Sequence, residues 1–479
     1  MNQETIVIVA NILMLTATIY FAIYISRKSR TAEGWMVAGR TLPWPVAILT
    51  QFATASGGGM LVAQVGIGYD YGWGVIIYGL CTGGGVLALL LLARWLRQHE
   101  FRSLPDIIKE LYGNHRILMT SVTIMAIVVP FGWLCTQLVA FSNLFHTFTG
   151  IAPTVLAIVF ACISLLFLLP GGMTSVAWTD AVFGGMMLVL TVVASVYAVQ
   201  SAGGWGEITQ AVGPERSGWA GLIAPGLLTI ALWSLSILPG TMTNQMYYQR
   251  IYAANNLQTV VISLIGTAVL LVATKIYAGL LGMSAYAQNP ELGNSEDAAG
   301  VMIAGMPIIL TVLYSTLICA TLLSTVTSAV QSVVVNIVQD VYNNWTTREI
   351  REASLLRASR IFSVIVLVAA VTLSQLFPEA LAWLVSAYAY AAAGLFCPVF
   401  LGFAFRRTKL INHHAAFAGV GAGVTAAGIA HILDTTIPYA AFGLGFSAGA
   451  MLLVGWLTSR DSEPRHRLET AEPAREGTR

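Results

Sequence analysis

The stretch ATASGGG, from Ala53 to Gly59, places three successive glycines near the middle of an apolar window long enough to cross a membrane, residues 44–67. Glycine exposes the backbone of a helix, and exposed backbone inside a bilayer is tolerated only where it lines a cavity or meets a ligand. Close packing against another helix is the competing explanation for such a run. We therefore expect a helix that is interrupted at membrane depth.

The composition of the chain places this helix in a lipid bilayer. Of 479 residues, 57% are hydrophobic and 10% are charged, and the mean hydropathy is +0.75. This leaves too little charge to cover the surface of a water-soluble protein. The five cysteines all fall within apolar windows, without a disulfide framework or paired metal-ligand spacing. No catalytic nucleophile with a neighbouring base is evident, so we expect no enzyme activity. We also expect no nucleic-acid partner and no obligatory protein partner.

Apolar windows of roughly 17 to 30 residues predict an all-α polytopic membrane protein with about 13 transmembrane helices. The windows are residues 6–26, 44–67, 73–96, 117–146, 152–170, 177–199, 224–240, 257–285, 303–337, 357–377, 380–404, 415–433 and 438–457. If they cross alternately, all but two of the 24 Lys and Arg residues lie on one side, the exceptions being Arg216 and Lys275. Basic residues mark the cytoplasmic side, so we expect the N-terminus outside and the C-terminus inside the cell membrane.

A second interruption relates two halves of the chain. Leu238, Pro239 and Gly240 lie close to the inner end of the seventh window, and proline breaks a helix. Two sets of five windows then each begin with an interrupted helix, about residues 44–199 and 224–404. This pattern is typical of inverted repeats with a binding site between the interrupted helices. We expect one transporter domain over residues 1–457, with one helix before the 5+5 core and two after it, and a disordered tail over residues 458–479.

Hydroxyl side chains form a stripe on the ninth window, in ICATLLSTVTSAVQSVVVNIVQD, from Ile318 to Asp340. Thr321, Ser324, Thr325 and Ser328 are spaced i, i+3, i+4 and i+7, which puts them on one face of a helix. Such hydroxyls either bond to the carbonyl one turn earlier or point inward as oxygen ligands. Hard cations such as sodium prefer several oxygen ligands, so the stripe is interpreted as half of a cation site.

Six segments together resemble the sodium/solute symporter family, whose members take up sugars, amino acids, carboxylates and similar solutes. They are AGRTLPW at 38–44, GIGYDYG at 66–72, LPDIIKELYG at 104–113, GGMTSVAWTD at 171–180, NQMYYQRIYAA at 244–254 and ATLLSTVTSAVQS at 320–332. They run in the family's order over nearly the whole chain. The resemblance implies a fold similar to the bacterial leucine transporter.

The resemblance also implies sodium ligands at matching positions. A structural sodium ion would be held by the backbone carbonyls of Ala53, Ser56 and Thr321. The hydroxyls of Ser324 and Thr325 would complete its ligands. Some members hold a second sodium ion nearer the cytoplasm, for which the matching residues are Asp180, Ser324, Thr327 and Ser328. Alternatively, Asp180 serves as a helix N-cap or pairs with a basic residue at the inner interface.

The chain departs from the sugar-transporting members of the family. They carry polar or acidic side chains where this chain has Gly58, Gly59 and Met60, and aromatic residues where it has Pro239 and Gly240. The N–H groups of Gly57, Gly58 and Gly59, with a half-helix dipole behind them, suit a carboxylate. Lys275 lies within the eighth window, where a buried ammonium should pair with a substrate carboxylate, a protein acid or carbonyl oxygens.

These observations predict a sodium-coupled symporter that imports a small organic solute, carboxylate- or amino-acid-like in preference to a sugar, by alternating access. A proton-coupled transporter of the same fold is the nearest alternative, with Asp180 or Lys275 as the titrating group. A membrane sensor built on a transporter scaffold is another. The sequence leaves open the solute, the number of sodium ions and the oligomeric state.

Overall fold

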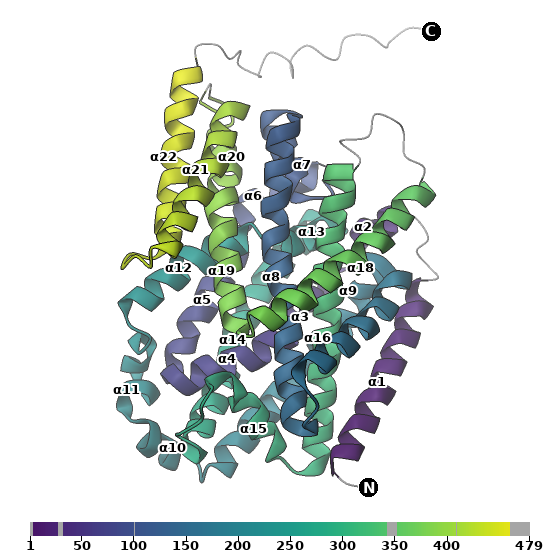
Figure 1. Ribbon diagram of the computed structural model, residues 1–479, viewed down its shortest axis with the longest axis vertical. Coiled ribbons are helices and arrows are strands. Elements are labelled where there is room, and N and C mark those ends of the chain that lie inside the picture. The colour runs from purple at the N-terminus through teal and green to yellow at the C-terminus, as the bar shows by residue number, and fades with distance from the viewer. Residues whose placement is uncertain (1–2, 27–31, 100, 343–351, 409, 460–479) are drawn as a thin grey trace.

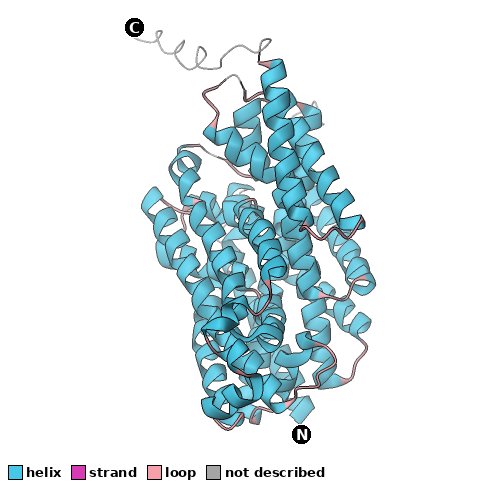
Figure 2. Ribbon diagram, turned by 90° about the vertical axis from the view of Figure 1, so that its left-hand side faces the viewer, coloured by secondary structure: helices cyan, strands magenta, loops and turns pink. Residues whose placement is uncertain are grey.

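The computed structural model describes residues 3–26, 32–99, 101–342, 352–408 and 410–459. Within these ranges the chain is helical, and the described residues contain no β-strand, only an isolated bridge between Leu42 and Ala254. Figure 1 and Figure 2 show the helices packed side by side into one bundle. The predicted all-α class is therefore confirmed. The tail predicted to be disordered lies, from residue 460 on, outside the described residues.

The first part of the chain forms eight α-helices up to residue 149. They are α1 (Gln3–Ser26), α2 (Ala32–Val37), α3 (Trp44–Ser56), α4 (Gly58–Tyr71), α5 (Val75–Ala88), α6 (Leu90–Gln98), α7 (Leu104–Tyr112) and α8 (Arg116–Thr149). The next helical run, α9 (Pro153–Ser201), is bent at Gly172, whose φ of 59° and ψ of −167° are not helical. This bend separates two predicted windows, residues 152–170 and 177–199.

The second half begins with short surface helices and a second pair of half-helices. Its elements are α10 (Trp205–Val212), α11 (Pro214–Ser217), α12 (Leu227–Met242), α13 (Gln245–Ala253), α14 (Leu257–Gln288), η4 (Ser295–Asp297), α15 (Ala298–Ala304) and α16 (Ile308–Val335). The remaining ones are the π-helical η5 (Asn336–Tyr342), α18 (Glu352–Leu376), α19 (Ala380–Ala391), the π-helical η6 (Ala392–Leu401), α20 (Gly402–Ala404), α21 (His413–Ile432) and α22 (Tyr439–Thr458).

By length and hydropathy, 11 helices within the described ranges could cross a membrane. Two predicted windows are not among them. The apolar helix Pro153–Leu168 is shorter than the others, and the window 44–67 is divided between α3 and α4. The number of about 13 transmembrane helices therefore stays a prediction, whereas the multi-pass character of the chain is established.

The two helix interruptions arise from different sequence features. Gly57, with φ −22° and ψ 162°, separates α3 from α4, as the glycine run predicts. The prediction of a break at Leu238 to Gly240 was wrong, because α12 continues through Pro239 to Met242. The second break comes at Thr243 and Asn244, where the Asn244 side chain accepts a hydrogen bond from the Met246 N–H (3.0 Å) and starts α13. An N-cap side chain, rather than proline, thus sets this boundary.

Helices outside the repeats flank the bundle. Figure 1 shows α1 at one edge and the paired helices α21 and α22 at the opposite edge. Helix α1 contacts α9 and α16, and α22 contacts η6. Between these edges, α3 packs against α9 and α14, and α16 packs against α8 and α9. The interrupted helices are therefore enclosed by the rest of the chain, as a buried binding site requires.

Candidate functional site

The hydroxyl stripe of α16 faces the first helix interruption. Every residue from Thr321 to Ser328 is buried. A Cβ atom built on Gly57 would collide with the side chain of Thr325. Only glycine therefore lets the end of α3 lie this close to α16, which explains the first residue of the glycine run by packing.

Three threonine hydroxyls between Thr321 and Ser328 donate to carbonyls of their own helix. Thr321, Thr325 and Thr327 donate to the carbonyl oxygens of Ile318 (2.9 Å), Thr321 (2.8 Å) and Ser324 (2.8 Å). This is the back-bonding alternative, and it leaves the lone pairs of each hydroxyl oxygen available to a cation. The Ser324 hydroxyl instead donates to Asp180 Oδ1 of α9. The Ser56 hydroxyl is buried and has no hydrogen-bond partner among the described residues.

Asp180 pairs with a basic side chain that the sequence interpretation had counted as a cytoplasmic loop charge. Arg250 of α13 donates from Nη2 to Asp180 Oδ2 at 2.9 Å, and both side chains are fully buried. The same nitrogen donates to Ser328 Oγ at 3.0 Å. Of the alternatives for Asp180, a basic partner is therefore the one observed, and two other residues assigned to a second sodium ion, Ser324 and Ser328, bond to this pair.

The interrupted helices complete the surroundings of this pair. The hydroxyls of Thr50 and Thr54 on α3 donate to Asp180 Oδ2 at 2.9 Å and 3.0 Å. Arg250 Nε donates to Thr50 Oγ1 (3.2 Å), and Nη1 donates to the Met246 carbonyl (3.0 Å). Sequence reasoning missed Thr50, Thr54 and Arg250. The signal for Arg250 was its place in the NQMYYQRIYAA segment, next to a predicted interruption.

Lys275 lies on the side of the first helix interruption that is opposite the hydroxyl stripe of α16. Its side chain is fully buried in α14, and its ammonium donates to Gln64 Oε1 of α4. A Cβ on Gly79 of α5 would collide with the Lys275 stem, so this glycine makes room for it. No carboxylate lies within ion-pair distance of Lys275 among the described residues. Of the partners considered for Lys275, the structure thus shows a neutral amide oxygen.

A small cavity connects Lys275 with the interruption. It is lined by Ser56, Leu61, Gln64, Thr274, Lys275, Tyr277 and Ala278, and its volume is about 10 Å³. That volume is enough for no more than about one water molecule. Gly58 and Gly59 form the first turn of α4 beside it. Of the residues expected to bind the solute, Lys275 therefore lines this cavity, and the glycines lie between two of its lining residues, Ser56 and Leu61.

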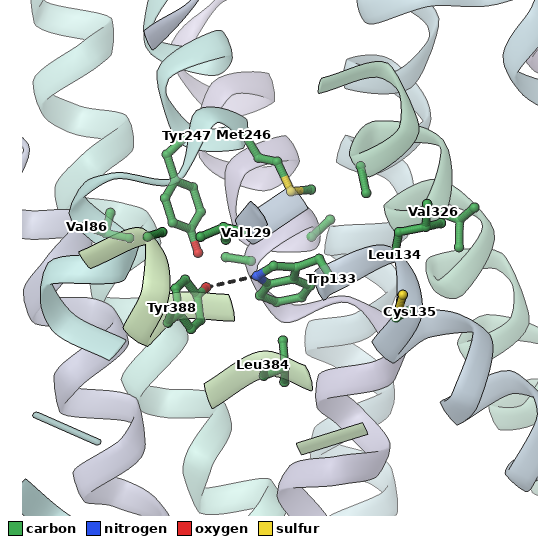
Figure 3. Close-up of a cluster of buried hydrophobic side chains, with 14 of the residues drawn as sticks. Val86, Val129, Trp133, Leu134, Cys135, Met246, Tyr247, Val326, Leu384 and Tyr388 are labelled. Carbon is green, nitrogen blue, oxygen red and sulfur yellow. Dashed lines mark hydrogen bonds between the residues drawn. The ribbon is translucent and has the colours of Figure 1, made fainter. Parts of the chain in front are cut away.

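Aromatic side chains close the region toward α19. Trp133 Nε1 of α8 donates to the hydroxyl of Tyr388 on α19 at 3.0 Å, and Tyr247 of α13 points toward Tyr388 (Figure 3). Gly240 of α12 packs directly on Tyr388, where a Cβ would collide. The second half-helix pair is thus held against α8 and α19 by large buried rings.

The fold itself defines a class of protein. The structure superposes on the substrate-bound, outward-open state of a Na⁺-coupled sialic acid symporter with a TM-score of 0.81, over 96% of this chain and 98% of that one, at 18% identity. The interruptions in two helices and this likeness identify the fold as that of the leucine-transporter type.

The chain belongs to the sodium:solute symporter family, whose model matches residues 35–423. It is 23% identical to the sodium/proline symporter of Salmonella typhimurium, covering 78% of each chain. It is also 23% identical to the high-affinity proline transporter of Bacillus subtilis, over 93% of this chain and 96% of that protein. These matches confirm the family resemblance and support sodium-coupled symport of a small solute. The family and the similar structures are transporters, not enzymes.

Proposed function

We propose that this protein imports a small solute bearing a carboxylate together with sodium, and that the two bind on opposite sides of the α3–α4 interruption. The observation that carries the proposal is this juxtaposition. Gly57 contacts the hydroxyl stripe at Thr325 on one side, while the preceding Ser56 lines the cavity of Lys275 on the other. One short piece of unwound backbone therefore contacts both proposed binding regions.

For the cation, we propose the carbonyls of Ala53, Ser56 and Thr321 and the hydroxyls of Ser324 and Thr325. All five residues are buried, with at most 2% of each exposed. Neutral oxygens at membrane depth suit a dehydrated sodium ion better than a proton, which needs a titrating group. A cation there would hold the end of α3 against α16 and so favour one arrangement of the interrupted helix.

For the solute, we propose a carboxylate that pairs with the Lys275 ammonium and the N-terminal N–H groups of α4. An ammonium buried without an acidic partner is unfavourable by several kcal/mol, and an incoming carboxylate would offset this. The named substrates of similar proteins, proline and sialic acid, both carry a carboxylate. Sodium and solute would then stabilise each other's binding by about 1 to 3 kcal/mol, which converts the sodium gradient into accumulation.

The test removes the two hydroxyls. Uptake is measured in proteoliposomes with an inward sodium gradient. Ser324→Ala and Thr325→Ala should each raise the sodium concentration needed for half-maximal uptake by about tenfold or more, because each variant loses one oxygen ligand. Uptake of radiolabelled proline is the first measurement, followed by other carboxylates and amino acids. Sodium binding to the purified variants is measured by thermal shift.

Ser363→Ala is the matched control. Its hydroxyl is also buried in a membrane helix, α18, where it donates to the Ser359 carbonyl at 2.8 Å, and this helix carries none of the proposed ligands. This variant should keep the parent's sodium dependence. Unchanged uptake and sodium requirement in both Ser324→Ala and Thr325→Ala would refute the proposed cation site.

A further inference from the structure

The buried pair of Asp180 and Arg250 joins four helices near the proposed cation site. Asp180 comes from α9, Arg250 from α13, Thr50 and Thr54 from α3, and Ser324 from α16. Both charged side chains have no exposed surface. A buried carboxylate surrounded by hydroxyls is a good site for a monovalent cation, because it supplies one full negative charge and several neutral oxygens.

The guanidinium already lies where such a cation would bind. Its Nη2 nitrogen lies between the carboxylate and a hydroxyl, at 2.9 Å from Asp180 Oδ2 and 3.0 Å from Ser328 Oγ. Asp180 Oδ2 also accepts from Thr50 and Thr54, and Oδ1 accepts from Ser324. Both carboxylate oxygens and the Ser328 oxygen are thus already engaged by donors from this chain.

The charge balance also argues against a sodium ion at Asp180. Arginine stays protonated in proteins, so the pair carries no net charge. A sodium ion placed at this carboxylate would lie next to the guanidinium, and two like charges repel strongly in a buried place. Without the guanidinium, the site would instead carry one uncompensated negative charge and three or more hydroxyls, a combination that attracts sodium.

We propose that Arg250 is a built-in cation at Asp180, so that one sodium ion, and not two, accompanies each solute molecule. This inference rests on the proposed sodium-coupled function and assigns its stoichiometry. It also gives Asp180 and Arg250 a positioning role. Because the Ser324 hydroxyl donates its proton to Asp180, its lone pairs are left free for the sodium ion on the other side.

The test counts sodium ions bound by the purified protein, using equilibrium binding of ²²Na⁺ without solute. The wild-type protein should bind about one ion per chain with a Hill coefficient near one, since only one set of oxygens lacks a cation. Arg250→Met vacates the carboxylate, and we expect the count and the Hill coefficient to rise toward about two. Asp180→Asn combined with Arg250→Met removes both charges and should return the count to about one.

Arg216→Met serves as the matched control, because Arg216 lies in an outer helix over the ring of Tyr286 and should leave the count unchanged. A wild-type count of two overturns the inference, whether or not the Arg250 variants fold. So does a folded Arg250→Met protein that still binds one ion, with folding judged by its thermal transition. A wild-type protein that binds no sodium at all refutes the proposed function itself, which distinguishes the two failures.

Discussion

At the scale of single residues, two buried cationic side chains set the chemistry of the site in different ways. Arg250 has a carboxylate partner at 2.9 Å, whereas Lys275 has only the amide oxygen of Gln64. A buried charge that is already paired within the protein gains no further stabilisation when a ligand approaches, so its role is structural. An uncompensated one attracts an anion. This difference is the reason for assigning the solute carboxylate to Lys275.

Replacing Lys275 by Met or Gln should weaken binding of a carboxylate solute by about 10- to 100-fold, because the pairing charge is lost. Sodium binding without solute should change far less. The measurement is a sodium-supported thermal shift with proline and sialic acid as probes, since similar proteins carry these solutes. Lys109→Met, at an exposed position of α7, is the control. Equal solute affinity in the parent and both Lys275 variants would exclude this role.

At the scale of elements, a side chain from the segment between α14 and α16 caps helix α19. Glu296 in η4 accepts the backbone N–H groups of Leu381 (2.9 Å) and Ala380 (3.2 Å) at the start of α19. A carboxylate at a helix N-terminus satisfies donors that have no partner within the helix. This contact links the segment between α14 and α16 to α19.

The Glu296 cap should make stability depend on pH. Burial raises the pKa of the Glu296 carboxyl above its ordinary value of 4.5, against the lowering effect of the two N–H donors, and the charges of Glu379 and Asp297 raise it further. The folded protein therefore holds a proton that the unfolded chain has released. The corresponding stabilisation is fully present below pH 4.5 and is lost as the pH rises through the raised pKa.

Glu296→Gln should remove this dependence, because the amide does not titrate. We expect the melting temperature of the parent, minus that of Glu296→Gln, to rise by on the order of 1 to 2 °C as the pH is lowered toward 4.5. Differential scanning fluorimetry over this range measures it. Glu291→Gln, an exposed acid of the same segment, should show no such difference. Parallel pH curves for the parent and Glu296→Gln would contradict the prediction.

At the scale of the whole molecule, hydrogen bonds join separate elements at both ends of the central region. At the end where α7 lies, Ser103 Oγ donates to Asp340 Oδ1 (2.9 Å), and the Leu104 N–H donates to Gln245 Oε1 (2.6 Å). At the other end, Glu296 caps α19, and Tyr69 donates to the Asn289 carbonyl (2.8 Å). The cavity lined by Ser56 and Lys275 has a volume of only about 10 Å³. We therefore expect these contacts to restrict access to it from both ends.

Loosening the α7 end should shift the protein toward opening on that side. Gln245→Ala removes the acceptor of a buried backbone N–H, a loss of about 1 kcal/mol, which corresponds to roughly a fivefold change in the opening equilibrium. A cysteine placed at the buried Thr54, in a variant without the native cysteines, should then react faster with a maleimide applied from that side. Gln375→Ala, which removes the hydrogen bond from Thr154 near the opposite edge, is the control. Equal labelling rates in the parent and Gln245→Ala would rule out this closure.

Sequence by itself determined the fold class and the family, because apolar windows, broken helices and ordered motifs are local properties of the chain. It also found the face of α16 and the interruption at Gly57. It misplaced the second interruption, because helix α12 tolerates Pro239 and its end depends on the side-chain cap from Asn244.

Only the tertiary structure decided which charges are compensated. Asp180 and Arg250 lie 70 residues apart in the sequence, and the partner of Lys275 lies 211 residues away. The energy of a buried charge depends on which groups the fold brings within hydrogen-bond distance, and residue spacing along the chain carries no information about that. The proposed roles of Arg250 and Lys275 therefore follow from packing among helices of both repeats.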